Sequence, residues 1–412
     1  MVLSMSGLGS YIEWGVKILR DMISIPTINP PGDKYKEFAY FSRDLLKELG
    51  FRTEVIEVPR SYVERFYPEY ASYPRYIVLG RLGDKSPVVH FNGHYDVVPP
   101  GSGWSVDPFG GEIRDGRIYG RGADDMKGGI AAFITATKIF IDRSRDFNGS
   151  IEVALVPDEE IGGESGTGYL VKVLGSRPSY VIVGEPSGSG TIWIGHRGSV
   201  WALIEIYGKQ AHGSTPWLGV NAFEYMIYIA KRLLEEYRSL LETRRSIYEY
   251  DDPRGAKPTV TIGGEVRGGA KTNIVPGYYA FSVDRRLIPE ERVEDAEREL
   301  IDLVNKISSE HREVRVNIKI TNRSPPALTD PGSKLVRLAR EAVREALGIE
   351  PRTTICLGGL DMRYYTEAGI ETITYGPGIL GNAHITDEFL SVEEFGKAVV
   401  AYTSILKKIL TQ

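Results

Sequence analysis

The feature that most constrains the fold is a set of short segments that are apolar along their whole length and alternate with helical segments. Residues 88–91, 150–156 and 180–183 lack the alternation of polar and apolar residues that marks a half-exposed strand. Apolar residues at helical spacing occupy residues 11–25, 35–49, 126–141, 333–347 and 392–410. This pattern predicts an α/β domain in which helices cover a mixed, mainly parallel sheet.

The order of elements changes at about residue 199. Strands are expected at residues 200–207, 258–266, 278–287 and 314–320, and helices at residues 221–243 and 289–308. This β-α-β-β-α-β order is ferredoxin-like, and the prolines at 325 and 326 mark its end. We therefore expect a catalytic domain formed by residues 1–198 and 323–412, with residues 199–322 as an inserted α+β domain.

Charge and cysteine content exclude several classes of function. Lys and Arg number 50 and Asp and Glu number 55, so the net charge of −5 argues against a broadly basic nucleic-acid binder. Cys356 is the single cysteine, which excludes an internal disulfide and a cysteine-based zinc site. Any metal must therefore be held by His, Asp and Glu. The N-terminus lacks a signal-peptide pattern and no apolar run reaches about 18 residues, so we expect a cytoplasmic protein without a membrane span.

Acidic and imidazole side chains follow three of the predicted strands. They are His94 and Asp96 after the first, Glu159 and Glu160 after the second and Glu185 after the third. Ligands of open α/β sheets bind outside the carboxyl ends of strands, where these residues are expected to meet. Asp96 is placed to orient the ring of a metal-bound His94. Each segment alone is also compatible with a solvated turn, and His90, inside its strand, is expected to belong to the core.

Two further segments carry candidate ligands. The glycine-rich stretch at residues 120–129 precedes a helix and contains Asp124 and Asp125; it is neither a dinucleotide fingerprint nor a phosphate-binding loop. An acidic helix cap is the alternative for this stretch. His384 follows the strand at residues 372–375 and brings a second histidine toward the same edge, with a surface histidine as its alternative.

Together these segments resemble the co-catalytic zinc hydrolase family of acetylornithine deacetylase, succinyl-diaminopimelate desuccinylase, aminoacylase and glutamate carboxypeptidase. The matching motifs run through nearly the whole chain in the order of the family. They are His94-x-Asp96, Gly120-Arg121-Gly122 through Asp125-Met126-Lys127-Gly128, Asp158-Glu159-Glu160, Gly184-Glu185-Pro186 and His384.

The resemblance implies two Zn²⁺ ions per chain, for which Co²⁺ can substitute. One ion would be held by His94 and Glu185 and the other by Glu160 and His384, with Asp125 bridging both. Imidazole and carboxylate are accepted zinc ligands. Glu159 would be the general base that takes a proton from the attacking water and passes it to the leaving amine.

The inserted domain resembles the lid of the same family, through which family members form homodimers. His212, in Lys209-Gln210-Ala211-His212-Gly213, would help to stabilise the oxyanion of the partner's active site, with a polar residue at a hairpin end as the alternative. Arg197, Asn273 and Arg285 match positions that can bind a substrate carboxylate. An ion pair inside the lid is the alternative for Arg285.

The expected activity is hydrolysis of the amide bond of an N-acyl amino acid, within amino-acid metabolism. Deacylases and carboxypeptidases of the family usually have Glu at the position of Glu185, whereas aminopeptidases and dipeptidases usually have Asp. A metallocarboxypeptidase or dipeptidase is the alternative activity, acting on short peptides. Leu360 stands where the desuccinylase loop has Thr-Ser before its Asp, which weighs against succinyl-diaminopimelate as the substrate.

Overall fold

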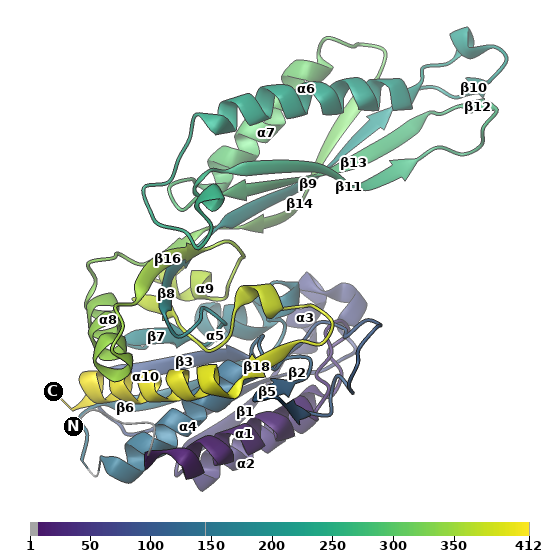
Figure 1. The fold of residues 1–412 in the computed structure, drawn as a ribbon. Helices are drawn as coiled ribbons and strands as arrows, with labels where there is room; N and C mark the ends of the chain where they lie inside the picture. The colour runs from purple at the N-terminus through teal and green to yellow at the C-terminus, as the bar shows by residue number, and fades with distance from the viewer. Residues whose placement is uncertain (1–6, 145, 412) are drawn as a thin grey trace. The chain divides into compact units, whose positions relative to one another are not determined.

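The computed structural model describes residues 7–144 and 146–411, which form two compact units (Figure 1). The first unit runs to Ile194 and also contains Thr329–Thr354 and the chain from Leu360 onward; the second contains Gly195–Leu328 and Ile355–Gly359. Residues 355–359 thus belong to the second unit, which the sequence did not indicate. The division at 198/199 and 322/323 into separately folding domains stays a prediction.

A large mixed sheet organises the first unit. In order across the sheet, its strands are β1 (Arg52–Val58), β2 (Arg75–Leu82), β6 (Ser150–Val156), β3 (Val88–His94), β7 (Tyr180–Val183), β17 (Thr372–Thr374), β8 (Thr191–His196) and β15 (Ala327–Leu328), with β16 (Arg352–Cys356) beside β8. By the division above, β15 and the last two residues of β8 and of β16 fall in the second unit. The central pairs β6–β3, β3–β7 and β7–β17 are parallel, and the pairs β1–β2, β2–β6 and β17–β8 are antiparallel. The predicted α/β class with a mainly parallel centre is confirmed.

Helices cover this sheet. They are α1 (Gly9–Ile23), α2 (Tyr35–Glu48), α3 (Arg60–Phe66), α4 (Lys127–Arg143), α5 (Tyr169–Lys172), α8 (Lys334–Leu347), α9 (Met362–Glu367) and α10 (Val392–Leu410). Helix α4 packs between α1 and α10, and α10 in turn contacts α8 (Figure 1). The ring of Phe133 on α4 stacks on Phe91 of β3 with centroids 3.8 Å apart. Helix α4 is buried along most of its length, so its N-terminus is fixed against the sheet.

The register of the parallel strands decides where the functional residues meet. His94, the last residue of β3, lies opposite Val156, the last residue of β6. Val183, the last residue of β7, lies opposite Asn92 of β3. The carboxyl ends of the three strands therefore reach one edge of the sheet, and the segments that follow them leave from the same place.

Several short elements escaped the sequence analysis because none has a periodic pattern. A small sheet of β4 (Ile113–Arg114), β5 (Arg117–Tyr119) and β18 (Phe389–Ser391) joins distant segments. The tyrosine-rich stretch at residues 61–74 largely comprises α3 and a 3-10 turn, η2 (Pro68–Tyr70). His90 is fully buried between Glu152 and Tyr365, as expected for a core histidine.

The second unit has the expected ferredoxin-like order. Its sheet runs β11 (Thr259–Gly268), β13 (Tyr278–Leu287), β9 (Gly198–Tyr207), β14 (Arg315–Ser324), and its helices are α6 (Ala222–Glu242) and α7 (Val293–Ser308). A two-residue pairing of β10 (Ala211–His212) with β12 (Ile274–Val275) extends from it. None of the helices in the described part of the chain combines the length and apolarity that crossing a bilayer requires.

The contact of α4 with the end of β7 requires a glycine, which gives a first prediction. A Cβ at Gly129 would overlap the carbonyl oxygen of Gly184. Gly129→Ala is expected to lower the free energy of unfolding by about 1–3 kcal/mol, measured by thermal or urea unfolding. Gly9→Ala is the control, because nothing lies within 4 Å of its Cβ and alanine favours the helix. Equal stability of Gly129→Ala and the parent protein would contradict the described helix–strand contact.

Candidate metal centre

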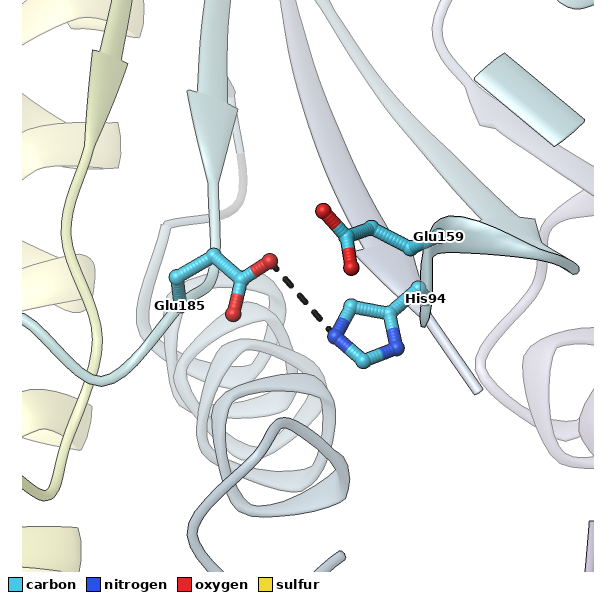
Figure 2. A group of neighbouring side chains, drawn as sticks. All are labelled: His94, Glu159 and Glu185. Atoms are coloured by element: carbon cyan, nitrogen blue, oxygen red, sulfur yellow. Dashed lines mark ion pairs between the residues drawn. The ribbon is translucent and has the colours of Figure 1, made fainter. Parts of the chain in front are cut away.

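The first group of potential ligands consists of His94, Glu159 and Glu185 (Figure 2). His94 ends β3, Glu185 follows β7, and Glu159 begins η3 (Glu159–Ile161), the 3-10 turn after β6. One ligand atom from each lies within 4.8 Å of the others, and His94 Nε2 is 3.5 Å from Glu185 Oε1. His94 and Glu185 are almost fully buried, so both ligands are held rigidly.

The second group consists of Asp125, Glu160 and His384. His384 Nε2 lies 3.0 Å from Glu160 Oε2 and 3.3 Å from Asp125 Oδ2. The other oxygen of Asp125, Oδ1, is 3.1 Å from His94 Nε2. The carboxylate of Asp125 therefore lies between the two groups and faces one histidine of each. The structure brings together all five of the side chains predicted as ligands.

The donor set fits divalent cations. Four carboxylates and two imidazoles converge here, a mixture of O and N ligands that suits zinc. Burial raises the pKa of Glu185 to about 7, and burial together with the charge of Glu185 raises the pKa of Glu159 well above its usual range. Burial alone would lower the pKa of His94, but Glu185 and its other acidic neighbours raise it well above its usual value. The carboxylates are thus both buried and close to one another, and bound cations would neutralise their negative charge.

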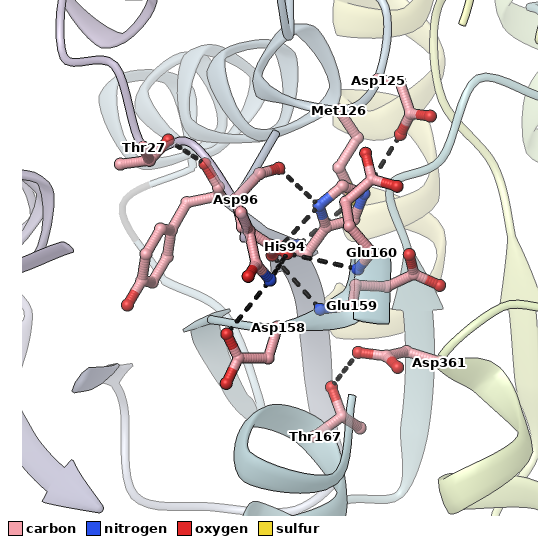
Figure 3. Close-up of polar contacts among 12 residues, drawn as sticks. Thr27, His94, Asp96, Asp125, Met126, Asp158, Glu159, Glu160, Thr167 and Asp361 are labelled. Atoms are coloured by element: carbon pink, nitrogen blue, oxygen red, sulfur yellow. Dashed lines mark hydrogen bonds and ion pairs between the residues drawn. The ribbon is translucent and has the colours of Figure 1, made fainter. Parts of the chain in front are cut away.

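Asp96 supports both groups at once (Figure 3). Its Oδ1 accepts the backbone N–H of Glu159 and its Oδ2 accepts the backbone N–H of Glu160, each at 3.2 Å. The hydrogen-bonding partner of His94 Nδ1 is the main-chain carbonyl of Asp96 at 3.0 Å, and the carboxylate Oδ1 lies further away at 3.5 Å. Asp96 is thus beside the ring as expected. Its carboxylate also holds the backbone of Glu159 and Glu160, which the sequence did not indicate.

Glu388 holds the turn that carries Asp125. Its Oε1 accepts the backbone N–H groups of Gly122, Asp124 and Asp125 at 3.0, 2.9 and 3.1 Å, and its other oxygen pairs with Arg121. Asp124 itself is buried and accepts the N–H of Ile379, away from the two groups. Glu388 is not recognisable from the sequence, because an isolated Glu after a loop gives no signal of burial.

The Leu360–Arg363 segment holds the far end of the Glu159–Glu160 turn. Arg363 Nη2 donates to the carbonyl of Gly162 at 2.6 Å. Thr167 Oγ1 donates to Asp361 Oδ2 at 2.5 Å, as Figure 3 shows. Leu360 is buried, with 5% of its surface exposed, so its side chain packs inside the unit. The difference from the desuccinylase loop at this residue therefore has less weight against a succinyl substrate than the sequence suggested.

The four candidates in the second unit differ in their surroundings. His212 is exposed and its Nδ1 lies 2.7 Å from Ser214 Oγ, and Asn273 is also exposed. Arg197 is mostly buried and donates to Thr259 Oγ1 at 3.0 Å. Arg285 is fully buried and forms an ion pair with Glu291 at 2.6 Å. For Arg285 the structure favours the ion-pair alternative over the expected contact with substrate, because its guanidinium has no exposed surface.

The sequence profile of peptidase family M20/M25/M40 matches residues 90–408. The chain belongs to this family. It is therefore a metal-dependent hydrolase of amide bonds, and the expected relation to the zinc deacylases and peptidases is confirmed. The match spans both compact units and includes all five candidate ligands.

Individual relatives cover most of the chain. A succinyl-diaminopimelate desuccinylase from Wolinella succinogenes is 30% identical over 387 residues, 92% of this chain and 95% of the relative. One from Thiobacillus denitrificans is 34% identical over 342 residues, 80% of this chain and 82% of the relative. Among solved structures, the di-peptidase Dug1p from Saccharomyces cerevisiae superposes with a TM-score of 0.77 at 18% identity, covering 99% of both chains. The metallo-carboxypeptidase Sso-CP2 from Sulfolobus solfataricus gives 0.75 at 21% identity, covering 96% and 98%. These two structures show the same fold.

The metal-free site should make stability depend on pH. Hydrogen bonds to Asp125 and Glu160 raise the pKa of His384 to about 10, against about 6.5 in an unfolded chain. Its contribution to stability is therefore complete below pH 6.5 and is lost as the pH rises to 10. In chelator, His384→Asn is expected to melt below the parent protein at pH 6 and at the same temperature at pH 10. A melting-temperature difference that stays constant between these pH values would contradict the assignment.

Proposed function

We propose that this protein removes the acyl group from an N-acyl amino acid, releasing a carboxylate and a free amine, with two divalent ions in the centre described above. The observation that carries the proposal is the position of Asp125, whose two carboxylate oxygens face His94 and His384. A carboxylate shared in this way suits a pair of ions, as does the even division of the other ligands. Zinc is the proposed ion, with cobalt as a substitute.

One ion would be held by His94 and Glu185, and the other by Glu160 and His384. Asp125 would bind both ions. When bound, the ions supply Lewis acidity for the scissile carbonyl and for the attacking water. The rigid burial of His94 and Glu185 and the support of Asp125 by Glu388 hold these ligands ready without reorganisation.

Glu159 is the proposed general base. It takes the proton from the attacking water at its carboxylate and delivers it to the nitrogen of the leaving amine. A base works best when its pKa lies near the working pH. Burial, which does not depend on bound ions, raises the pKa of Glu159 above its usual value. The hydrogen bond from the backbone N–H of Glu159 to Asp96 fixes the backbone position from which the Glu159 side chain extends.

The substrate class follows from the relatives and from Glu185. The relatives with the coverage given above are named desuccinylases, and Glu185 is the residue type usual in deacylases of the family. An N-succinyl amino acid is therefore the first substrate to test.

His212 is proposed to stabilise the oxyanion across a homodimer formed by the second unit. Arg197 and Asn273 are proposed to bind the substrate carboxylate. Such a reaction belongs to cytoplasmic amino-acid metabolism.

A substrate panel tests the proposed function. The metal-free protein is reconstituted with zinc or cobalt and assayed for amine release from N-succinyl, N-acetyl and other N-acyl amino acids, and from dipeptides. We expect the highest kcat/KM with an N-acyl amino acid and no turnover in chelator. Higher kcat/KM with dipeptides would replace the proposal by the carboxypeptidase or dipeptidase alternative.

Substitution can distinguish whether Glu159 acts as the general base or as a metal ligand. Glu159→Gln is expected to keep the metal content of the parent protein while kcat falls by about 10²–10⁴-fold, because proton transfer is lost. Glu160→Gln is the matched control, since it removes a proposed ligand one residue away and should lower the metal content. Metal loss in Glu159→Gln would show that Glu159 is a ligand, and an unchanged kcat would show that it is not the base.

A further inference from the structure

One buried ion pair lies directly behind the metal centre and takes no part in the steps above. Arg75, the first residue of β2, donates from Nε to Asp158 Oδ2 at 2.7 Å, and neither side chain has any exposed surface. Burying two charges is costly unless the geometry is good and the remaining polar atoms are hydrogen-bonded. Asp158 meets this condition, because Tyr35 OH donates to its Oδ1 at 3.0 Å and Ser165 Oγ donates to its Oδ2.

Asp158 stands where the sheet ends and the carboxylate turn begins. It follows β6 by two positions and immediately precedes Glu159 and Glu160. Its φ of +68° is in the left-handed region, where the chain turns away from the direction of the strand. The contacts of its carboxylate hold the residue at the point of this change in direction, just before Glu159 and Glu160.

A short chain of hydrogen bonds continues from this ion pair to the backbone of the turn. Asn29 Nδ2 donates to Asp158 Oδ1 at 3.1 Å and to Asp96 Oδ2 at 2.9 Å. Asp96 in turn accepts the N–H groups of Glu159 and Glu160 (Figure 3). Asp158 thus acts on the turn in two ways, through its own backbone and through Asp96.

The other end of the guanidinium is anchored in the tyrosine-rich segment at residues 61–74. Arg75 Nη1 donates to the carbonyl of Tyr73 at 2.7 Å and approaches that of Tyr70 at 3.4 Å. Gly32, with a φ of +98°, lies close against the guanidinium, since a Cβ there would be 2.6 Å from Nη1. Tyr67 OH, from the same segment, accepts the N–H of Glu164 at 3.1 Å and so reaches the far side of the turn.

We propose that Arg75 is a positioning residue, which fixes Glu159 and Glu160 through Asp158 and so gives the tyrosine-rich segment a part in the metal centre. The inference rests on the roles proposed above for Glu159 and Glu160. A planar fork that donates to a carboxylate on one side and to carbonyls on the other cannot be reproduced by the single ammonium of lysine. Groups that orient metal ligands commonly affect metal affinity or activity by about 10–100-fold.

The test compares Arg75→Met, Arg75→Lys and the double variant Arg75→Met/Asp158→Asn. The double variant removes both charges and leaves no unpaired buried carboxylate, so we expect it to fold. Lys408→Met is the matched control, because Lys408 is a mostly buried cation of the same unit, paired with Glu341 and Glu345 at 3.1 and 2.6 Å. For each protein, circular dichroism and thermal unfolding check the fold. Calorimetric titration of the metal-free protein with Zn²⁺ gives metal affinity, and the preferred substrate of the panel gives kcat and KM.

We expect the folded Arg75 variants to lose about tenfold or more in kcat at saturating zinc, with KM changed less than threefold. At least one zinc-binding step should weaken about tenfold, and Arg75→Lys should recover only part of either loss. Lys408→Met should lower the melting temperature but leave kcat, KM and zinc affinity unchanged. A double variant or Arg75→Lys with kcat and zinc affinity within twofold of the parent protein would overturn the proposal, leaving Arg75 a purely structural residue. A parent protein without activity on the panel would overturn the proposed function instead, and zinc titration would still decide the role of Arg75.

Discussion

Four carboxylates crowd together at one edge of the sheet, and the surrounding structure is arranged to hold them there. Asp125, Glu159, Glu160 and Glu185 approach one another with His94 and His384 as their positively charged neighbours. Burial and the neighbouring carboxylates both disfavour the charged form, and burial is the main reason that the pKa values of Glu159 and Glu185 are raised. A fold that keeps them there must hold each backbone segment firmly and must be completed by cations.

The support for this site comes from residues that are not themselves proposed as ligands. Glu388 gathers three backbone N–H groups of the turn around Asp125, and Asp96 does the same for Glu159 and Glu160. Both supporting groups are carboxylates, yet each binds backbone N–H groups instead of a proposed metal, and Glu388 also pairs with Arg121. Glu388 and Asp96 thus form a second set of acidic residues beside the site, and their carboxylates accept hydrogen bonds from the backbone.

The segments that carry the candidate ligands were predictable because their signal is local, and the family resemblance then selected the five residues among them. Each follows a strand or precedes a helix whose apolar pattern is plain, and parallel strands must end at one edge of the sheet. His90, four positions before His94, was correctly separated from the ligands because it lies within its strand and not at the end. The supporting residues could not be found in this way. Arg75 and Glu388 look like surface charges in the sequence, and only long-range packing buries them.

Periodicity and strand ends are properties of neighbouring residues, so the α/β class, the ferredoxin-like insert and the residue types at the strand ends follow from local pattern. Long-range packing is what places Asp125 opposite both histidines, pairs Arg285 with Glu291, and connects the tyrosine-rich segment to the carboxylate turn through Arg75. These are contacts between segments far apart in the chain. They are set by strand register and by the need to pair every buried charge, neither of which a local pattern records.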